Sequence, residues 1–222
     1  MQRNIVITGA NKGIGLELTK AYQAKGDKVF ALVRNSSKEL EEIDGITIIR
    51  NIDLARLKNF SVLDELLSSV VIDILINNAG IMTEESLGQI DYEQVENQFL
   101  VNAIGPLRLT EYLMPHLQKG SKVVLITSRM GSISDNSSGG FYGYRVSKAA
   151  LNTLGVSLAR DLEPKGIAVG MLHPGFVKTG LVENQGEINA DEAARRLILS
   201  IEKLNLKESG SFRHSNGEKL PW

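Results

Sequence analysis

Tyr144 and Lys148 are the two side chains in this sequence that best suit proton transfer. They stand four positions apart in a segment with helical periodicity, so both project from one helix face about one turn apart. A free tyrosine has a pKa of about 10, and catalysis near neutral pH favours a value roughly two to three units lower. We expect the ammonium group of Lys148 to lower the pKa of Tyr144.

Ser128 is a third residue with a chemical use. It follows the β-branched run 122–127, at the carboxyl end of a predicted strand, where open parallel sheets bind ligands. A hydroxyl there can polarise a substrate carbonyl, whereas a simple turn-forming serine is the alternative. His116, His173 and His214 have no metal-ligand spacing, and we expect no bound metal.

The run from Thr8 to Gly15 suits a phosphate group. Gly9, Gly13 and Gly15 join the first predicted strand to a long helix, where a backbone without side chains turns tightly and approaches a pyrophosphate. Free amides and the helix dipole favour the anion there. An ordinary glycine-rich turn is the alternative, and we favour cofactor binding.

The second predicted strand ends in a cation. Arg34 stands where dinucleotide sites distinguish the adenosine ribose, and an arginine suits a 2′-phosphate better than a free hydroxyl. Together with Lys12 it predicts NADP(H) in preference to NAD(H). The alternative is that both are solvated surface cations.

Short apolar runs alternate with longer amphipathic segments along the chain. The runs 4–8, 28–33, 46–50, 72–77, 122–127 and 167–172 predict buried parallel strands, and the segments 13–25, 91–119, 142–162 and 190–204 predict helices. This alternation predicts an α/β fold: a doubly wound, mainly parallel sheet of about seven strands with helices on both faces. Residues 132–140, rich in Ser and Gly, are the best candidate for a mobile loop.

The composition restricts the class of partner. The 25 basic and 26 acidic residues nearly cancel, so we expect no nucleic acid or membrane partner and a small-molecule substrate instead. The absence of Cys suits a reducing compartment, and no targeting leader is evident, which favours the cytoplasm. A length of 222 residues suits one domain, 1–222.

Five motifs in order make the chain resemble the short-chain dehydrogenase/reductases over nearly its whole length. They are Thr8-Gly9-x-x-x-Gly13-x-Gly15, Asn77-Asn78-Ala79-Gly80, Asn102 within Val101-Asn102-Ala103-Ile104-Gly105, Ser128 with Tyr144-x-x-x-Lys148, and Pro174-Gly175-x-Val177-x-Thr179. The run 139–152 and the ending 217–222 resemble the branch that contains C-factor and the sniffer-like carbonyl reductases. The resemblance implies a Rossmann-type NAD(P)-binding fold and oxidoreduction between a carbonyl and an alcohol.

The resemblance also implies a catalytic role for four residues. Tyr144 would be the proton donor in reduction, Ser128 would orient the carbonyl, and Lys148 would hold the ribose and adjust the pKa of the tyrosine. Asn102 would anchor a water of the proton relay, with a buried structural amide as the alternative interpretation.

The cofactor would lie against a larger set of residues. By the resemblance, Asp53 would meet the adenine edge, Asn78 would brace the sheet, and Thr179 would contact the carboxamide or the phosphate. A helix N-cap is the alternative for Asp53. The full predicted set is Gly9, Asn11, Lys12, Gly13, Ile14, Gly15, Arg34, Asp53, Asn78, Ala79, Gly80, Tyr144, Lys148, Pro174, Gly175, Val177 and Thr179.

Two features depart from the common family pattern. Tyr144 follows Ser128 by sixteen positions, a few more than in many relatives, so loop 132–140 is expected to reshape the substrate entrance. The stretch 180–190 is short, which leaves little chain for a helical lid and predicts an open site. We expect the following residues to line it: Met82, Arg129, Met130, Phe141, Tyr142 and Phe176.

Other functions remain as alternatives. A non-enzymatic NADP(H)-binding sensor or signalling protein would use the same fold, but it has no need of all four catalytic residues. A nucleotide-sugar epimerase would need a further substrate domain, and an enoyl reductase would place a tyrosine where Phe141 stands. The predicted helices 91–117 and 142–162 have more apolar positions than a core-facing stripe requires, and the resemblance implies that they pair in a homodimer or homotetramer.

Overall fold

The computed structural model describes residues 2–56 and 60–222, and within them the chain forms one parallel sheet. The strands lie in the order β3-β2-β1-β4-β5-β6-β7, and each neighbouring pair is parallel. Their bounds are β1 Asn4–Thr8, β2 Lys28–Leu32, β3 Thr47–Ile49, β4 Ile72–Asn77, β5 Leu117–Ile126, β6 Ala168–His173 and β7 Ser211–His214. The predicted α/β fold and the sheet of about seven strands are confirmed.

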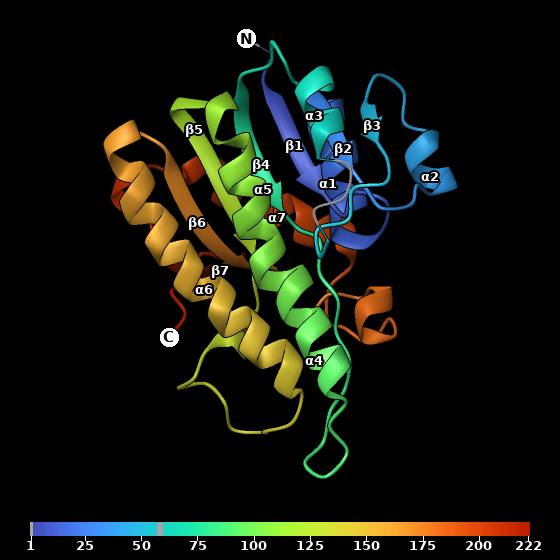
Figure 1. The fold of residues 1–222 in the computed structure, drawn as a ribbon, viewed down its shortest axis with the longest axis vertical. Coiled ribbons are helices and arrows are strands. Elements are labelled where there is room, and N and C mark those ends of the chain that lie inside the picture. The colour runs from blue at the N-terminus through green and yellow to red at the C-terminus, as the bar shows by residue number, and fades with distance from the viewer. Residues whose placement is uncertain (1, 57–59) are drawn as a thin grey trace.

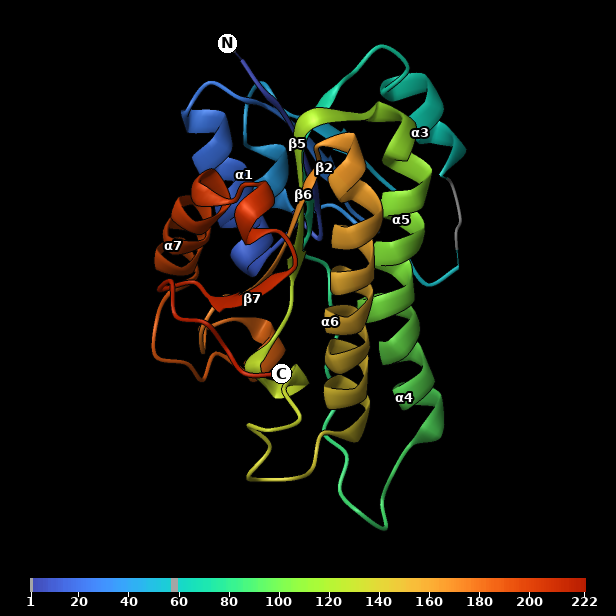
Figure 2. The same cartoon turned by 90° about the vertical axis from the view of Figure 1, so that its left-hand side faces the viewer.

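Helices cover both faces of this sheet (Figures 1 and 2). The helices α1 and α7 contact each other on one face, whereas α4, α5 and α6 lie on the other, as Figure 2 shows edge-on. The bounds are α1 Gly13–Ala24, α2 Lys38–Glu41, α3 Ser61–Leu66, α4 Tyr92–Phe99, α5 Gly105–Leu113, α6 Tyr142–Leu162 and α7 Ala190–Lys203. None of the helices among the described residues is long and apolar enough to cross a membrane.

The continuous apolar runs arise because each central strand is buried on both sides. In β1, Ile5 and Ile7 belong to the core cluster beneath α1 and α7, while Val6 between them belongs to the cluster on the other face. Successive side chains of a strand point to opposite faces, so a sheet sandwiched between helices needs an apolar residue at every position.

Most predicted elements match the structure, but the prediction of one long helix over residues 91–119 is wrong. It forms α4, a π-helical turn at Leu100–Ile104, α5 and a short 3-10 turn, and β5 already begins at Leu117. Pro106 lacks the N–H that an α-helix would direct to the carbonyl of Asn102, so regular bonding is interrupted there. The start of β5 was missed because its first residues pair irregularly with β4. Leu117 pairs with Ile72, and the register shifts before the next pair, Lys122 with Ile74.

Three short elements of the structure were not predicted from the sequence. Strand β7 and helices α2 and α3 have between four and six residues each, too few for a periodic pattern. Apart from β5, α4 and α5, the remaining strands and helices begin and end within two residues of the predicted positions, and the bounds of β1, β4 and α6 are as predicted.

The strand order reverses at β1, which pairs with β2 on one side and β4 on the other. The connections that leave these two strands therefore diverge at the carboxyl edge and open a crevice, which is where doubly wound sheets bind ligands. Residues 9–15 follow β1 and residues 78–83 follow β4, so both segments lie at this crevice.

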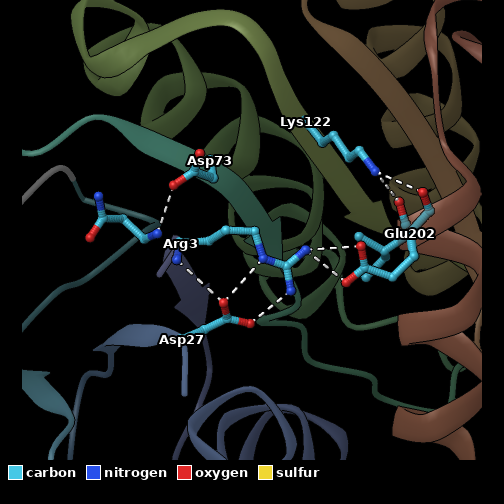
Figure 3. Close-up of polar contacts among 7 residues, drawn as sticks. Arg3, Asp27, Asp73, Lys122 and Glu202 are labelled. Atoms are coloured by element: carbon cyan, nitrogen blue, oxygen red, sulfur yellow. Dashed lines mark hydrogen bonds and ion pairs between the residues drawn. The ribbon is translucent and has the colours of Figure 1, made fainter. Parts of the chain in front are cut away.

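The opposite edge of the sheet is held by charged groups (Figure 3). Arg3 donates to both carboxylate oxygens of Asp27, with its Nη2 2.7 Å from Oδ2, and its Nη1 lies 2.8 Å from Oε1 of Glu202. Nearby, Lys122 donates to two carbonyl oxygens at the end of α7, at 2.8 and 3.0 Å. These contacts join β1, β5 and α7 away from the crevice.

Candidate active site

A cleft of about 650 Å³ lies at the carboxyl edge, centred on the ends of β1 and β4. Most of the predicted site residues border it. They are Gly9, Asn11, Lys12, Gly13, Ile14, Gly15, Arg34, Asp53, Asn78, Ala79, Gly80, Tyr144, Lys148, Pro174 and Thr179. Four predicted residues do not border it: Asn102, Ser128, Gly175 and Val177.

The glycines of the first turn are required by close backbone contacts. Gly9 has a left-handed φ of 65°, and a Cβ on it would stand 2.9 Å from Cα of Ala79. A Cβ on Gly15 would stand 2.2 Å from the carbonyl oxygen of Gly9. Only glycine fits both positions without moving the backbone, so the turn is built for close approach to the cleft.

Asn78 and Thr8 lock this turn to β4. The side-chain Nδ2 of Asn78 donates to the carbonyl of Thr8 at 2.9 Å and to that of Gly9 at 3.3 Å. In return, Oγ1 of Thr8 accepts the amides of Asn78 and Ala79 at 2.9 and 3.0 Å. The two walls of the crevice are therefore joined by four hydrogen bonds, as expected for a bracing role of Asn78.

The start of α1 can accept an anion. Lys12 occupies the N-cap position and gives the helix no side-chain cap, so the first amides of α1, which have no intrahelical partners, are available at the cleft. Lys12 and Arg34 are both exposed, border the cleft and, within residues 2–56 and 60–222, have no ion pair or side-chain hydrogen bond. Two cations that have no charged partner among the described residues thus stand beside the first amides of α1.

Asp53 borders the same cleft and also makes a local turn contact. Its Oδ1 accepts the amide of Ala55 at 3.0 Å. Ile52 and Leu54 on either side of it are buried and border the cleft as well, which gives this end an apolar floor beside one carboxylate. An apolar surface beside a carboxylate acceptor suits a purine edge.

Tyr144 and Lys148 border the other end of the cleft, and Ser128 lies beside Tyr144 without bordering the cleft itself. Their exposed fractions are 7 %, 4 % and 7 %, and the side chains of Tyr144 and Ser128 lie near enough to interact. Nζ of Lys148 lies 5.7 Å from the centre of the Tyr144 ring and donates to the carbonyl of Ile126 at 2.9 Å. Helix α6 supplies two of these residues and the end of β5 the third, so one helix and one strand end set the geometry.

The pKa of Tyr144 differs from our expectation. Burial raises the pKa of Tyr144 to about 12, and its interaction with Ser128 acts in the lowering direction without offsetting burial. Burial also lowers the pKa of Lys148 to about 8. In the polypeptide by itself, desolvation of the phenolate therefore outweighs any help from the ammonium group, and the predicted lowering is wrong for this state.

Asn102 lies in the π-helical turn and is connected to α6 through hydrogen bonds. Its Oδ1 accepts the amide of Ile81 at 2.8 Å, and its Nδ2 donates to the carbonyl of Ile81 at 2.8 Å and to Oγ of Ser147 at 3.0 Å. Ser147 in turn donates to the carbonyl of Tyr144 at 2.8 Å. The fully buried amide thereby ties the segment after β4 to α6, next to Tyr144.

The segment after β6 reaches the cleft only at its two ends. Pro174 and Thr179 border the cleft, and a Cβ on Gly13 would stand 3.2 Å from Cγ2 of Thr179. Gly175 and Val177 lie outside because the chain folds back there, and Val177 pairs with Ile188. The following stretch holds only the three-residue 3-10 turn Gly180–Val182 before α7.

Only one of the six residues expected to line the substrate side borders the cleft, namely Met82. Tyr142 and Phe176 are 37 % and 48 % exposed, so they face solvent instead. Arg129 is turned outward by ion pairs with Asp135 and Glu218, at 3.1 and 3.8 Å. Arg129, Met130, Phe141, Tyr142 and Phe176 thus lie outside this cleft, and their lining of a substrate site stays a prediction.

Loop 132–140 is joined at its start to a distant part of the chain. The carbonyl of Trp222 accepts hydrogen bonds from Oγ of Ser132 at 3.0 Å and from the amide and Oγ of Ser134 at 3.0 and 2.8 Å. The Trp222 ring stacks on Phe212 with 5.4 Å between ring centres. The start of this loop therefore rests on β7 and the segment after it.

Sequence reasoning missed part of the cleft wall. The missed residues mostly stand one or two positions from predicted ones, at the ends of strands, where position alone could have indicated them. They are Thr8, Leu32, Asn35, Ile52, Leu54, Ile81, Thr83, Gln94, Asn97, Val101, Ile126, Thr127, Gly180 and Leu181.

The comparisons agree with this geometry. The family described as short chain dehydrogenase matches residues 3–190. A Rhodococcus sp. (strain AD45) protein, 1-hydroxy-2-glutathionyl-2-methyl-3-butene dehydrogenase, is 37 % identical over 98 % of this chain and 99 % of its own length. The C-signal of Myxococcus xanthus is 41 % identical over 68 % of this chain and 93 % of that protein.

Two solved structures have the same fold over the full chain. Carbonyl reductase Sniffer of D. melanogaster superposes with a TM-score of 0.91 at 28 % identity and covers 100 % of both chains. An NADPH-bound carbonyl reductase from chicken fatty liver superposes with a TM-score of 0.90 at 26 % identity, covering 100 % of this chain and 99 % of the other. With its glycine turn, its Asn78 brace and its buried tyrosine and lysine, this chain belongs to the short-chain dehydrogenase/reductase family of oxidoreductases, in the branch of sniffer and C-signal.

Proposed function

We propose that this protein reduces a carbonyl compound to an alcohol with NADPH, and that Tyr144 is its general acid. The observation that carries the proposal is the burial of Tyr144 beside Ser128 at one end of the cleft. The far end carries Lys12 and Arg34, which have no ion pair within the described residues. Proton transfer and cofactor selection thus have separate residues within one cleft.

The residues present fit a dinucleotide phosphate. The close approach of Gly9 and Gly15 leaves no room for a Cβ, so phosphate oxygens can reach the first amides of α1. Lys12 and Arg34 would bind the 2′-phosphate, because neither is engaged by a carboxylate among the described residues. Asp53 would meet the adenine edge, and Thr179 would meet the carboxamide or phosphate end.

Bound NADPH would supply the hydride that reduces the carbonyl carbon. The side chain of Ser128 donates a hydrogen bond to the carbonyl oxygen and orients it, and Tyr144 gives its phenolic proton to that oxygen as the alcohol forms. Lys148 holds the ribose and opposes the negative charge left on the phenolate. Asn102 holds the segment after β4 against α6 and would anchor a water that returns the proton.

The protonation state of Tyr144 favours the reducing direction. A pKa of about 12 keeps the phenol protonated at neutral pH, so the group is ready to donate. Alcohol oxidation requires the phenolate instead, which burial disfavours in the polypeptide by itself.

The test is a turnover assay with both cofactors. NADPH and NADH are each mixed with the protein and a panel of aldehydes, ketones and quinones, and cofactor absorbance is followed. We expect NADPH-dependent reduction of at least one panel member, with a kcat/KM that favours NADPH over NADH. A kcat/KM that favours NADH would refute the cofactor assignment.

A non-enzymatic sensor of NADP(H) is the second reading of the same cleft. It predicts tight NADPH binding with no turnover of any panel member. The burial of Tyr144, Ser128 and Lys148 together counts against it, because burying ionisable groups is costly and a sensor needs only the cofactor end.

The quaternary structure and compartment belong to the same proposal. Tyr92 on α4 and Val146 on α6 are 71 % and 54 % exposed on two helices that pack together, and we expect them to take part in a homodimer or homotetramer interface. Light scattering at working concentration tests this, and a monomer would refute it. We expect the protein in the cytoplasm, where NADPH is available.

A further inference from the structure

Glu85 is a buried residue with a carboxylate side chain. It does not border the cleft, and it has no role in the proposed reaction. It is 3 % exposed and lies in the connection between β4 and α4, next to the exposed Glu84. Burying a carboxylate is unfavourable unless hydrogen bonds compensate for its lost hydration. The partners of Glu85 therefore indicate what this burial maintains.

The carboxylate meets the start of the catalytic helix. Its Oε2 accepts the amide of Gly143 at 3.1 Å, and its backbone carbonyl accepts the amide of Phe141 at 2.9 Å. Tyr144 is the next residue along α6. One residue from another segment thus holds the two amides that lead into the catalytic tyrosine.

Helix α6 has no cap of its own. Phe141 occupies the N-cap position with a left-handed φ of 52°, and its side chain has no acceptor to offer. The first turn of α6 contains no acidic residue either. Because Gly143 is buried, water cannot readily replace a lost partner of its amide, so Glu85 performs the capping from outside the helix.

The other carboxylate oxygen joins this cap to the cleft wall. Oε1 accepts from Nε2 of Gln98 at 2.7 Å and from the hydroxyl of Thr83. Nε2 of Gln98 also donates to Oγ1 of Thr83 at 2.7 Å. Oε1 of Gln98 accepts a hydrogen bond from the backbone amide of Thr83 at 3.1 Å. Thr83 borders the cleft, so the network runs from the wall of the cleft to the start of α6.

The absence of a side chain at position 143 makes this network possible. A Cβ on Gly143 would stand 2.3 Å from Nε2 of Gln98 and 3.0 Å from Cα of Val95. Helix α6 therefore approaches α4 closely enough for Gln98 and Glu85 to reach its backbone.

We propose that Glu85 is a positioning residue for Tyr144: its carboxylate caps α6 in trans and fixes the phenol relative to the cleft wall. The inference rests on the proposed function for its effect on turnover. A small displacement of a reacting group costs large factors in rate, so the loss is expected in kcat and not in cofactor binding.

The experiment compares Glu85→Ala, Glu85→Gln and the matched control Glu84→Ala in the full chain. We expect Glu85→Ala to lower kcat for carbonyl reduction roughly ten- to one-hundredfold, with the Kd of NADPH within about twofold of wild type. Glutamine keeps one acceptor for the Gly143 amide, so Glu85→Gln should lie between wild type and Glu85→Ala. Glu84→Ala should match wild type.

Hydrogen exchange measured without substrate separates this inference from the proposed function. We expect faster exchange in peptides covering 140–146 of Glu85→Ala, with the end of α6 and the sheet unchanged. If the wild type reduces no carbonyl, the proposed function fails and the exchange result alone decides the capping claim. Unchanged exchange in peptides 140–146 of Glu85→Ala would overturn the inference. So would a general loss of structure, in which NADPH affinity and kcat decrease by similar factors and the whole sheet exchanges faster.

Discussion

The ammonium of Lys148 lies 5.7 Å from the centre of the Tyr144 ring, yet its 2.9 Å hydrogen bond is to the carbonyl of Ile126 at the end of β5. The position of the lysine is therefore set by the sheet as well as by its own helix. This hydrogen bond links α6, which carries both Tyr144 and Lys148, to the strand that also leads to Ser128. The consequences can be tested residue by residue.

Removing the phenolic hydroxyl of Tyr144 should abolish carbonyl reduction and leave NADPH binding largely unchanged. General acid catalysis contributes about 10²- to 10⁴-fold, so Tyr144→Phe should lower kcat by at least about a hundredfold. The Kd of NADPH, measured by fluorescence titration, should stay within roughly threefold, because the anion site lies at the other end of the cleft. Tyr92→Phe, on a side chain 71 % exposed, is the control. A Tyr144→Phe enzyme with near-normal kcat would show that another group is the acid.

Lys148 should cost the protein stability at neutral pH. Burial lowers the pKa of Lys148 from 10.5 to about 8, so the unfolded chain binds more protons between these values and stability rises with pH through that window. Replacing the lysine with methionine removes a buried charge at similar volume. Lys148→Met should raise the free energy of unfolding at pH 7 by on the order of 2 kcal/mol, with the gain shrinking towards pH 10.

Urea unfolding at both pH values measures this effect, with the exposed Lys38→Met as the control. Lys148→Met should lose turnover although its free energy of unfolding at pH 7 is higher than that of the wild type. A net loss of stability at pH 7 would mean that the hydrogen bond to Ile126 outweighs the burial of the charge.

Arg34 should decide between the two nicotinamide cofactors. A hydrogen bond to a charged group contributes about 1.5–3 kcal/mol, so Arg34→Ala should raise the KM for NADPH roughly ten- to one-hundredfold. The KM for NADH should change less than about threefold, since NADH carries no 2′-phosphate. Arg50→Ala, which removes an exposed arginine paired with Glu41, is the matched control. Equal losses with both cofactors would place Arg34 elsewhere than at the 2′-phosphate.

Arg3 should affect stability alone. It pairs with the buried Asp27 and with Glu202 at the edge of the sheet opposite the cleft (Figure 3). Arg3→Ala leaves Asp27, 7 % exposed at its side chain, without its main partner, and should lower the free energy of unfolding by about 1–3 kcal/mol. The kcat and KM values should match wild type below the shifted melting range. A change in kcat at constant folded fraction would contradict this separation of the two edges.

Local sequence patterns predicted the regular elements because periodicity is a local property. Strand β1 and helix α6 could be bounded from their own residues, and the glycine spacing placed the phosphate turn. The same locality failed over 91–119, where the interruption at the π-helical turn and the early start of β5 depend on Pro106 and on pairing with β4.

The sequence by itself determined the fold class, the family and the residue types that meet at the carboxyl edge, since these follow from periodicity, spacing and motif order. The tertiary structure decided the protonation and the support of the site. Burial set the pKa of Tyr144 above its ordinary value, and long-range packing brought Glu85 to the start of α6 and Trp222 to Ser134. Desolvation and contacts between distant segments depend on where the whole chain places a group, which no local pattern encodes.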